Sequence, residues 1–102
     1  MYKVLIAPPA ERYFKKIKDM NLKLKFKEAM SVIGENPYIA EEKRGDLSGF
    51  RSLDVRYNGV NYEIAYKIYE IEDKQVVVIL AGTRENFYEE LKRIAKQYKD
   101  WR

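Results

Sequence analysis

Residues 75–93 read QVVVILAGTRENFYEELKR and join an apolar strand pattern directly to a helical one. Both faces of residues 76–80 are apolar, which predicts a strand in the middle of a sheet. The helical pattern opens at Arg84, so this arginine is expected at the rim of the sheet, with Tyr88 one turn later on nearly the same face. A fixed guanidinium and a phenol at a sheet edge can serve phosphate chemistry, or they can be an ordinary cap and an ordinary packed aromatic.

The residues before this segment carry both strand and helix patterns. Residues 2–7 predict a short strand, which two prolines end at the start of a helix. Apolar residues then recur at helical spacing in two segments, with Asn21 expected to cap the second helix and Gly34 to lie at its end. The two helices are expected to form an antiparallel hairpin with their lysines on the outer faces.

A meander of three strands is expected next. Residues 51–57 alternate apolar and polar side chains, and Asn58-Gly59 is a strong hairpin signal before the strand at residues 60–68. A second turn is expected at residues 72–74. The chain is therefore predicted to be a single α+β domain over residues 1–102, ordered β-αα-βββ-α. Its antiparallel sheet is expected to include the first strand, with the helices packed on it.

The composition argues against several kinds of site. Apolar residues make up 46% of the chain, enough for a core without disulfides, and cysteine and histidine are both absent. Without them a zinc or other soft-metal site is not expected, and the five glycines are too scattered for a phosphate-binding loop. We therefore expect no metal and no cofactor. No apolar run approaches the roughly 20 residues that cross a bilayer, which predicts a soluble cytoplasmic protein without a membrane partner.

The net charge of +4 is unevenly distributed along the chain. Between residues 12 and 27 there are seven basic side chains and one acidic side chain. The basic residues are Arg12, Lys15, Lys16, Lys18, Lys23, Lys25 and Lys27. A surface of this kind attracts RNA or an acidic protein, or it is only the solvated side of two helices.

Short motifs accompany this order of elements: Leu47-Ser48-Gly49-Phe50, then Tyr62 and Tyr66 in the meander, then Gly82-Thr83-Arg84 before the last helix. Together they resemble the RelE/ParE superfamily of toxins from type II toxin–antitoxin systems, and most closely the RelE-like mRNA interferases. The resemblance covers nearly the whole chain and implies a small RelE-like domain with a cognate antitoxin. For a RelE-type member it implies cleavage of mRNA with the ribosome, and for a ParE-type member inhibition of DNA gyrase without catalysis. A non-toxic binding module of the same fold is a third alternative.

Metal-free RNA cleavage uses the 2′-hydroxyl of the RNA as nucleophile, so the site needs a base, an acid and cations for the phosphorane. The resemblance to RelE-like nucleases assigns phosphate stabilisation to Arg84, unless this side chain only forms a salt bridge with Glu63 or Asp54. Tyr88 is expected to act as the acid or to stack on a base, unless it only packs beside Phe87.

Three further residues of the meander are candidates for the site. Arg51 and Arg56 lie in its first strand with side chains on opposite faces, and Arg56 is favoured because it shares a face with Asp54. Glu63 stands where many RelE-like nucleases carry an arginine, so it is either a general base or a surface partner of Arg56 or Lys67. RNA backbone binding is expected from Lys15, Lys16, Lys23, Lys25 and Lys27.

Overall fold

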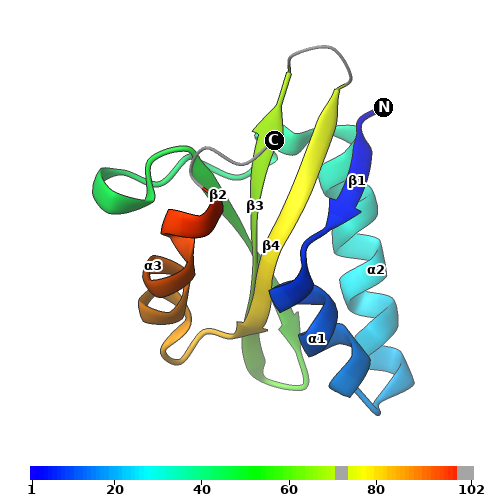
Figure 1. Cartoon of the computed structure of the whole chain (residues 1–102). Helices are drawn as coiled ribbons and strands as arrows, with labels where there is room; N and C mark the ends of the chain where they lie inside the picture. The colour runs from blue at the N-terminus through cyan, green and yellow to red at the C-terminus, as the bar shows by residue number, and fades with distance from the viewer. Residues whose placement is uncertain (71–73, 99–102) are drawn as a thin grey trace.

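A computed structural model of the chain describes residues 1–70 and 74–98, and its centre is a four-stranded sheet with strand order β1-β4-β3-β2 (Figure 1). The strands are β1 (Lys3–Ile6), β2 (Phe50–Tyr57), β3 (Val60–Tyr69) and β4 (Gln75–Thr83). The last three form the expected antiparallel meander, and β4 lies inside the sheet as its apolar pattern predicts. β1 joins the sheet as expected but runs parallel to β4, so the sheet is mixed rather than wholly antiparallel.

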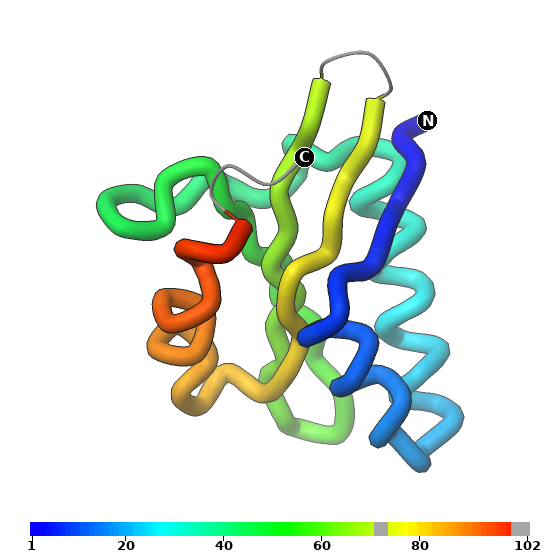
Figure 2. The backbone as a smooth tube through the Cα atoms, in the orientation of Figure 1, coloured from blue at the N-terminus to red at the C-terminus, as the bar shows by residue number. Residues whose placement is uncertain are grey.

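Helices cover both faces of this sheet. On one side lie α1 (Pro8–Lys16) and α2 (Met20–Glu35), and on the other lies α3 (Phe87–Tyr98), as the backbone trace in Figure 2 also shows. Each side has its own apolar core, because alternate residues of the strands point to opposite faces. Phe26 and Ile33 anchor the core under α1 and α2, and Leu91 anchors the core under α3.

Two local predictions were wrong. The cap of α2 is Asp19, not Asn21, because the Asp19 carboxylate accepts hydrogen bonds from the backbone N–H groups of Asn21 and Leu22 at 2.9 and 3.3 Å. The last helix begins at Phe87, three residues after Arg84. The intervening turn contains Asn86 with a φ of 61°, a left-handed conformation that no helix interior adopts.

The hairpin between β2 and β3 has the expected two-residue turn. Asn58 and Gly59 have φ values of 50° and 76°, as a turn with two left-handed central residues requires. This turn fixes the register so that Asp54 lies directly opposite Glu63. The turn predicted at residues 72–74 falls mostly outside the described residues.

A β-bulge interrupts the pairing of β3 with β4. Ala65 pairs with Leu80 and Tyr66 pairs with Val78, which leaves Ile79 without a partner in β3. Beyond this bulge Gly82 lies opposite Glu63, at the end of the strand that leads to Arg84. The hairpin turn and the bulge together determine what surrounds Glu63. Among the described residues, no helix is long and apolar enough to span a membrane.

Candidate functional site

Glu63 is the centre of a polar cluster beneath the start of α3. Its side chain is 0% exposed, and within residues 1–70 and 74–98 it is the one charged residue that is fully buried. It accepts hydrogen bonds from the Ser52 hydroxyl at 2.5 Å, from Arg84 Nε at 2.9 Å and from the Tyr88 hydroxyl at 3.1 Å. The expectation that Glu63 is a surface partner of Arg56 or Lys67 is therefore wrong, because α3 folds over the face that strand alternation left open.

Arg84 bridges two carboxylates. Asp54 and Glu63 lie directly opposite each other on β2 and β3, where two like charges repel. Arg84 contacts Glu63 Oε2 through Nε and Asp54 Oδ2 through Nη2, the second contact at 3.1 Å. The hydrogen bond to Glu63, and then that to Asp54, hold the pKa of the Arg84 guanidinium above its ordinary value. Both salt bridges considered from the sequence are thus present.

The backbone around Arg84 is held as firmly as its side chain. Its N–H donates to the carbonyl of Asn61 at 2.9 Å, and its own carbonyl accepts from the N–H of Phe87 at 3.1 Å. The side chain nevertheless remains 52% exposed, so one side of the guanidinium faces solvent. A cation fixed in this way at a sheet rim can meet an anionic ligand without large rearrangement.

Tyr88 is positioned from three directions and is half-buried. Its hydroxyl donates to Glu63, and its ring packs edge-on against Phe87 with centroids 5.5 Å apart. The Lys43 ammonium lies 4.6 Å from the centre of the Tyr88 ring, a cation–π contact. The packing beside Phe87 that the sequence suggested is therefore present, and the hydroxyl makes a polar contact with Glu63 as well.

The two arginines of β2 have separate surroundings. Arg56 is exposed on the same face as Asp54, and its Nη1 donates to Asn61 Oδ1 at 3.3 Å, beside the Arg84 turn. Arg51 points to the opposite face, where it donates to the carbonyl of Ala40 at 2.6 Å. It also stacks on Tyr38, with its guanidinium carbon 4.8 Å from the ring centre. The structure therefore brings Arg56 near the cluster and leaves Arg51 out of it.

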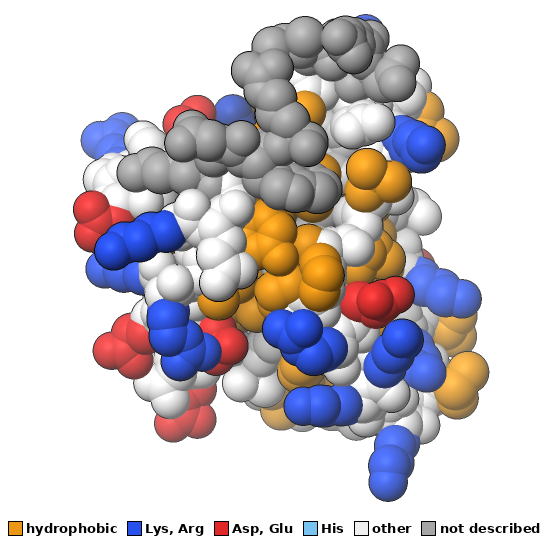
Figure 3. All heavy atoms as spheres, in the orientation of Figure 1, with side chains coloured by type: hydrophobic (Ala, Val, Ile, Leu, Met, Phe, Trp, Pro, Cys, Tyr) orange, Lys and Arg blue, Asp and Glu red, His pale blue; other side chains and the backbone are white. Residues whose placement is uncertain are grey.

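The basic helices lie on the other side of the sheet. Lys15 and Lys16 are in α1, whereas Lys23, Lys25 and Lys27 are in α2. Figure 3 shows lysine and arginine side chains gathered over these two helices, with acidic and basic side chains mixed around α3. The lysines form an extended positive surface, as expected, but α1 and α2 cover the face opposite to the one under which Glu63 lies.

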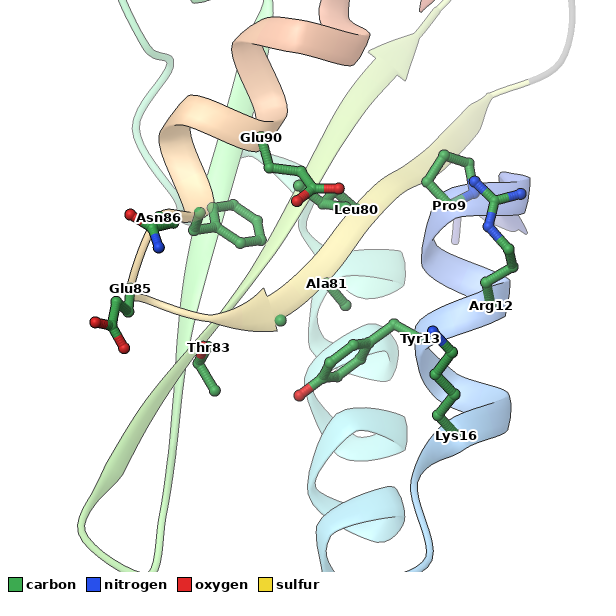
Figure 4. Close-up of a pocket in the computed structure, with 12 residues that line it drawn as sticks. Pro9, Arg12, Tyr13, Lys16, Leu80, Ala81, Thr83, Glu85, Asn86 and Glu90 are labelled. Carbon is green, nitrogen blue, oxygen red and sulfur yellow. The ribbon is translucent and has the colours of Figure 1, made fainter.

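β1 pairs only with residues 75–78 of β4, so residues 80–83 form an open edge of the sheet. A groove of about 300 Å³ lies along this edge, between α1 and the start of α3. From α1, Tyr13 points toward β4, with Arg12 and Lys16 beside it (Figure 4). Glu85 and Glu90 stand on the other side, and β4 forms the floor. Its two walls thus carry opposite charges. None of the groups bonded to Glu63 lines this groove, so the cluster is a separate feature of the surface.

Sequence reasoning missed the contribution of Lys43 and the role of Ser52. Lys43 lies in a segment without regular periodicity, and no spacing in the sequence signals its contact with Tyr88. The position of Asp54 opposite Glu63 could have been predicted from the sequence, because a two-residue turn at Asn58 implies that register.

Comparisons with known proteins agree with this architecture. A sequence model of the family described as "ParE-like toxin of type II bacterial toxin-antitoxin system" matches residues 4–92. Comparison with curated proteins gave no match. A mutant of the E. coli toxin RelE in the free state superposes with a TM-score of 0.72, at 18% identity, over 93% of this chain and 96% of that chain.

Two complexes with antitoxins are also similar. The RelBE2 toxin–antitoxin complex from Mycobacterium tuberculosis gives a TM-score of 0.61 at 24% identity, over 81% of this chain and 98% of that chain. The E. coli RelE mutant bound to an antitoxin RelB peptide gives 0.61 at 25% identity, over 91% and 97%. The fold is therefore RelE-like, as expected. The match over residues 4–92 shows that the chain belongs to the ParE-like toxins of type II bacterial toxin–antitoxin systems.

Proposed function

We propose that this toxin is a metal-independent endoribonuclease that cleaves mRNA with the ribosome and is held inactive by a cognate antitoxin. The observation that carries the proposal is the convergence of Arg84 and Tyr88 on the buried Glu63 carboxylate. A guanidinium that can stabilise a phosphorane and a phenol that can exchange a proton are thus held on one carboxylate, and both kinds of group serve RNA cleavage without a metal.

Arg84 is the phosphate-stabilising group in this proposal. Its exposed side meets a phosphate oxygen while its Nε remains bonded to Glu63, so the guanidinium does not have to reorganise as charge builds on the phosphorane. A preorganised donor of this kind contributes roughly 10²–10³-fold to the rate. Arg56 and Lys43 add positive charge at the edges of the cluster. Arg51 has no part in it, because its side chain lies on the opposite face of the sheet.

Tyr88 is the group that handles protons or stacks on a base. Its hydroxyl is fixed by Glu63 and its ring is held between Phe87 and Lys43. Glu63 itself does not touch the RNA in this proposal, since its side chain is fully buried beneath Ser52, Arg84 and Tyr88. It holds the two reacting side chains in place.

The lysine surface of α1 and α2 supports a large RNA partner. Lys15, Lys16, Lys23, Lys25 and Lys27 lie on helices that cover the opposite side of the sheet from the Glu63 cluster. In this proposal the mRNA occupies the cluster, and ribosomal RNA around the bound toxin contacts the lysines of α1 and α2. Binding should therefore weaken steeply with salt, as each phosphate contact releases counterions.

A cognate antitoxin is proposed as the protein partner. The similar structures include toxins bound to RelB antitoxins, and this chain has the same fold. Expression with its neighbouring gene should yield a stable complex of the toxin and a small protein. Purification of the toxin alone from its native host, with no co-purifying protein, would count against this partner.

Inhibition of DNA gyrase is the second candidate function. The observation in its favour is that Asp54 and Glu63 already neutralise Arg84, so an RNA phosphate has to compete with two carboxylates. The ParE-like description of the family is consistent with it. A non-toxic binding module of the same fold remains a further alternative, and normal growth on expression without any antitoxin would favour it.

One experiment separates these functions. The purified toxin is added to a translating extract, where mRNA integrity is followed, and in parallel to DNA gyrase, where supercoiling is followed. We expect cleaved mRNA and unaffected supercoiling. Intact mRNA together with blocked supercoiling would replace the nuclease by the gyrase inhibitor, and no effect in either assay would leave only the binding module.

A further inference from the structure

The geometry points to a proton relay in which Tyr88 takes the proton of the RNA 2′-hydroxyl and passes its own proton to Glu63. The inference rests on the proposed ribonuclease activity and assigns the base of that reaction. Tyr88 is then the catalytic residue in contact with the RNA, and Glu63 is a positioning residue that acts through it.

Direct action by Glu63 is excluded by its burial. The carboxylate is 0% exposed, and Ser52, Arg84 and Tyr88 occupy its oxygens. A base has to approach within hydrogen-bond distance of the proton that it removes. A 2′-hydroxyl could reach Glu63 only if one of these partners moved away, which would break the cluster that holds Arg84.

Tyr88 is oriented to accept a proton. Its hydroxyl donates to Glu63 Oε1 at 3.1 Å, which directs its own hydrogen inward. Its oxygen lone pairs do not take part in that bond and can accept a hydrogen bond from a ligand, and the residue is half-buried rather than enclosed. The same side chain acts as acceptor toward the RNA and donor toward Glu63, as a relay requires.

The step balances in protons and bonds. The 2′-hydroxyl loses its proton to the Tyr88 oxygen while the Tyr88 hydrogen moves to Glu63. The 2′-oxygen forms a bond to phosphorus, and the bond from phosphorus to the 5′-oxygen breaks, leaving a 2′,3′-cyclic phosphate. A solvent water protonates the 5′-oxygen, and the hydroxide that it leaves behind takes back the proton from Glu63 through Tyr88.

The charged groups around Glu63 come from each neighbouring element. Asp54 approaches from β2, Arg84 from the turn after β4, and Lys43 from the segment before β2, where it lies against the Tyr88 ring. Asp54 cannot replace Glu63 in the relay, because its side chain is 65% exposed and its recorded contact is with Arg84 rather than with the phenol.

The test measures RNA cleavage against pH in a purified translation system, with wild type, Glu63→Gln and Tyr88→Phe. Glu63→Gln keeps the size and an acceptor oxygen but cannot take a proton, and Tyr88→Phe keeps the ring. We expect both variants to cleave roughly 10²–10⁴-fold more slowly. Wild type should lose rate at low pH, and this loss should be absent from both variants. The double variant should be no slower than either single one.

The matched control is Tyr57→Phe. Tyr57 donates to Asp19 at 3.0 Å, so this variant removes a tyrosine–carboxylate hydrogen bond of the same kind on the other side of the sheet. It should cleave at the wild-type rate with the wild-type pH profile. If Glu63→Gln does not fold, Tyr88→Phe carries the same test.

Three results would overturn the relay. A Glu63→Gln variant whose cleavage rate still falls at low pH as in wild type shows that Glu63 has only a structural role. Additive losses in the double variant show that the two residues act separately. If wild type does not cleave RNA at all, the proposed function fails and the relay fails with it, which is distinguishable from an active wild type with unchanged variants.

Discussion

Replacing Arg84 with alanine should destabilise the protein as well as inactivate it, because it removes the cationic partner of a buried carboxylate. Arg84 donates to Glu63 at 2.9 Å, and a hydrogen bond to a charged group contributes about 1.5–3 kcal/mol. The exposed contact with Asp54 adds only about 0–1 kcal/mol. Because the Arg84 side chain is 52% exposed, water replaces part of what is lost. We therefore expect a loss of about 2 kcal/mol.

Urea denaturation followed by circular dichroism measures this loss. In a domain of this size it corresponds to a fall in Tm of about 8–16 °C. The mechanism is tested by repeating Arg84→Ala in a Glu63→Gln background, where no buried charge is left unpaired. There the cost should fall to about 1 kcal/mol, the contribution of an ordinary hydrogen bond. The coupling between the two positions is then about 1 kcal/mol.

Arg93→Ala is the control for this experiment. Arg93 forms an exposed pair with Glu90 at 3.0 Å on the surface of α3, and its removal should cost less than about 1 kcal/mol. An Arg84→Ala variant as stable as the Arg93→Ala variant would refute the reasoning. So would an equal cost of Arg84→Ala in the wild-type and Glu63→Gln backgrounds.

Three further outcomes are expected. Arg56→Ala should slow mRNA cleavage at least about tenfold because Arg56 shares the face of the cluster, whereas Arg51→Ala should not; equal rates for the two variants would contradict the assignment. Lys25→Ala should reduce the slope of log K for ribosome binding against log salt concentration by about 1. An unchanged slope in a binding titration would show that Lys25 does not contact RNA. The hydrogen bond to Glu70 raises the pKa of Tyr2 to about 12 from 10.0. The stability that Tyr2 contributes is therefore complete below pH 10 and lost as pH rises toward 12. Tyr2→Phe should flatten this alkaline loss in denaturation curves, and identical curves would exclude the linkage.

Much of the fold was predictable because its signals are local. The alternation in β2 and β3, the Asn58-Gly59 turn and the apolar run of β4 all specify strands without reference to tertiary contacts. The errors have equally local causes. Asp19 and Asn21 are both good caps, and the left-handed Asn86 delays the last helix, so neither boundary follows from periodicity alone.

The site was less predictable, because it depends on which element covers which face. Alternation puts Glu63 on the polar side of β3, and only the packing of α3 over that side buries it. The approach of Lys43 to Tyr88 depends on how the segment between α2 and β2 lies along the edge strand β2, where Glu42 bridges to Arg51. Arg84 was found from sequence because the end of an apolar strand marks a sheet rim, but its two carboxylate partners required the strand register.

Primer extension on cellular mRNA tests the central claim most directly. Wild-type toxin and Arg84→Ala are each induced without antitoxin, and folding of the variant is checked by its binding to the antitoxin. We predict new 5′ ends within translated reading frames after induction of wild type and none after induction of Arg84→Ala. Toxicity without new 5′ ends, or the same 5′ ends from both proteins, would contradict the assignment of the Glu63 cluster as a ribonuclease site.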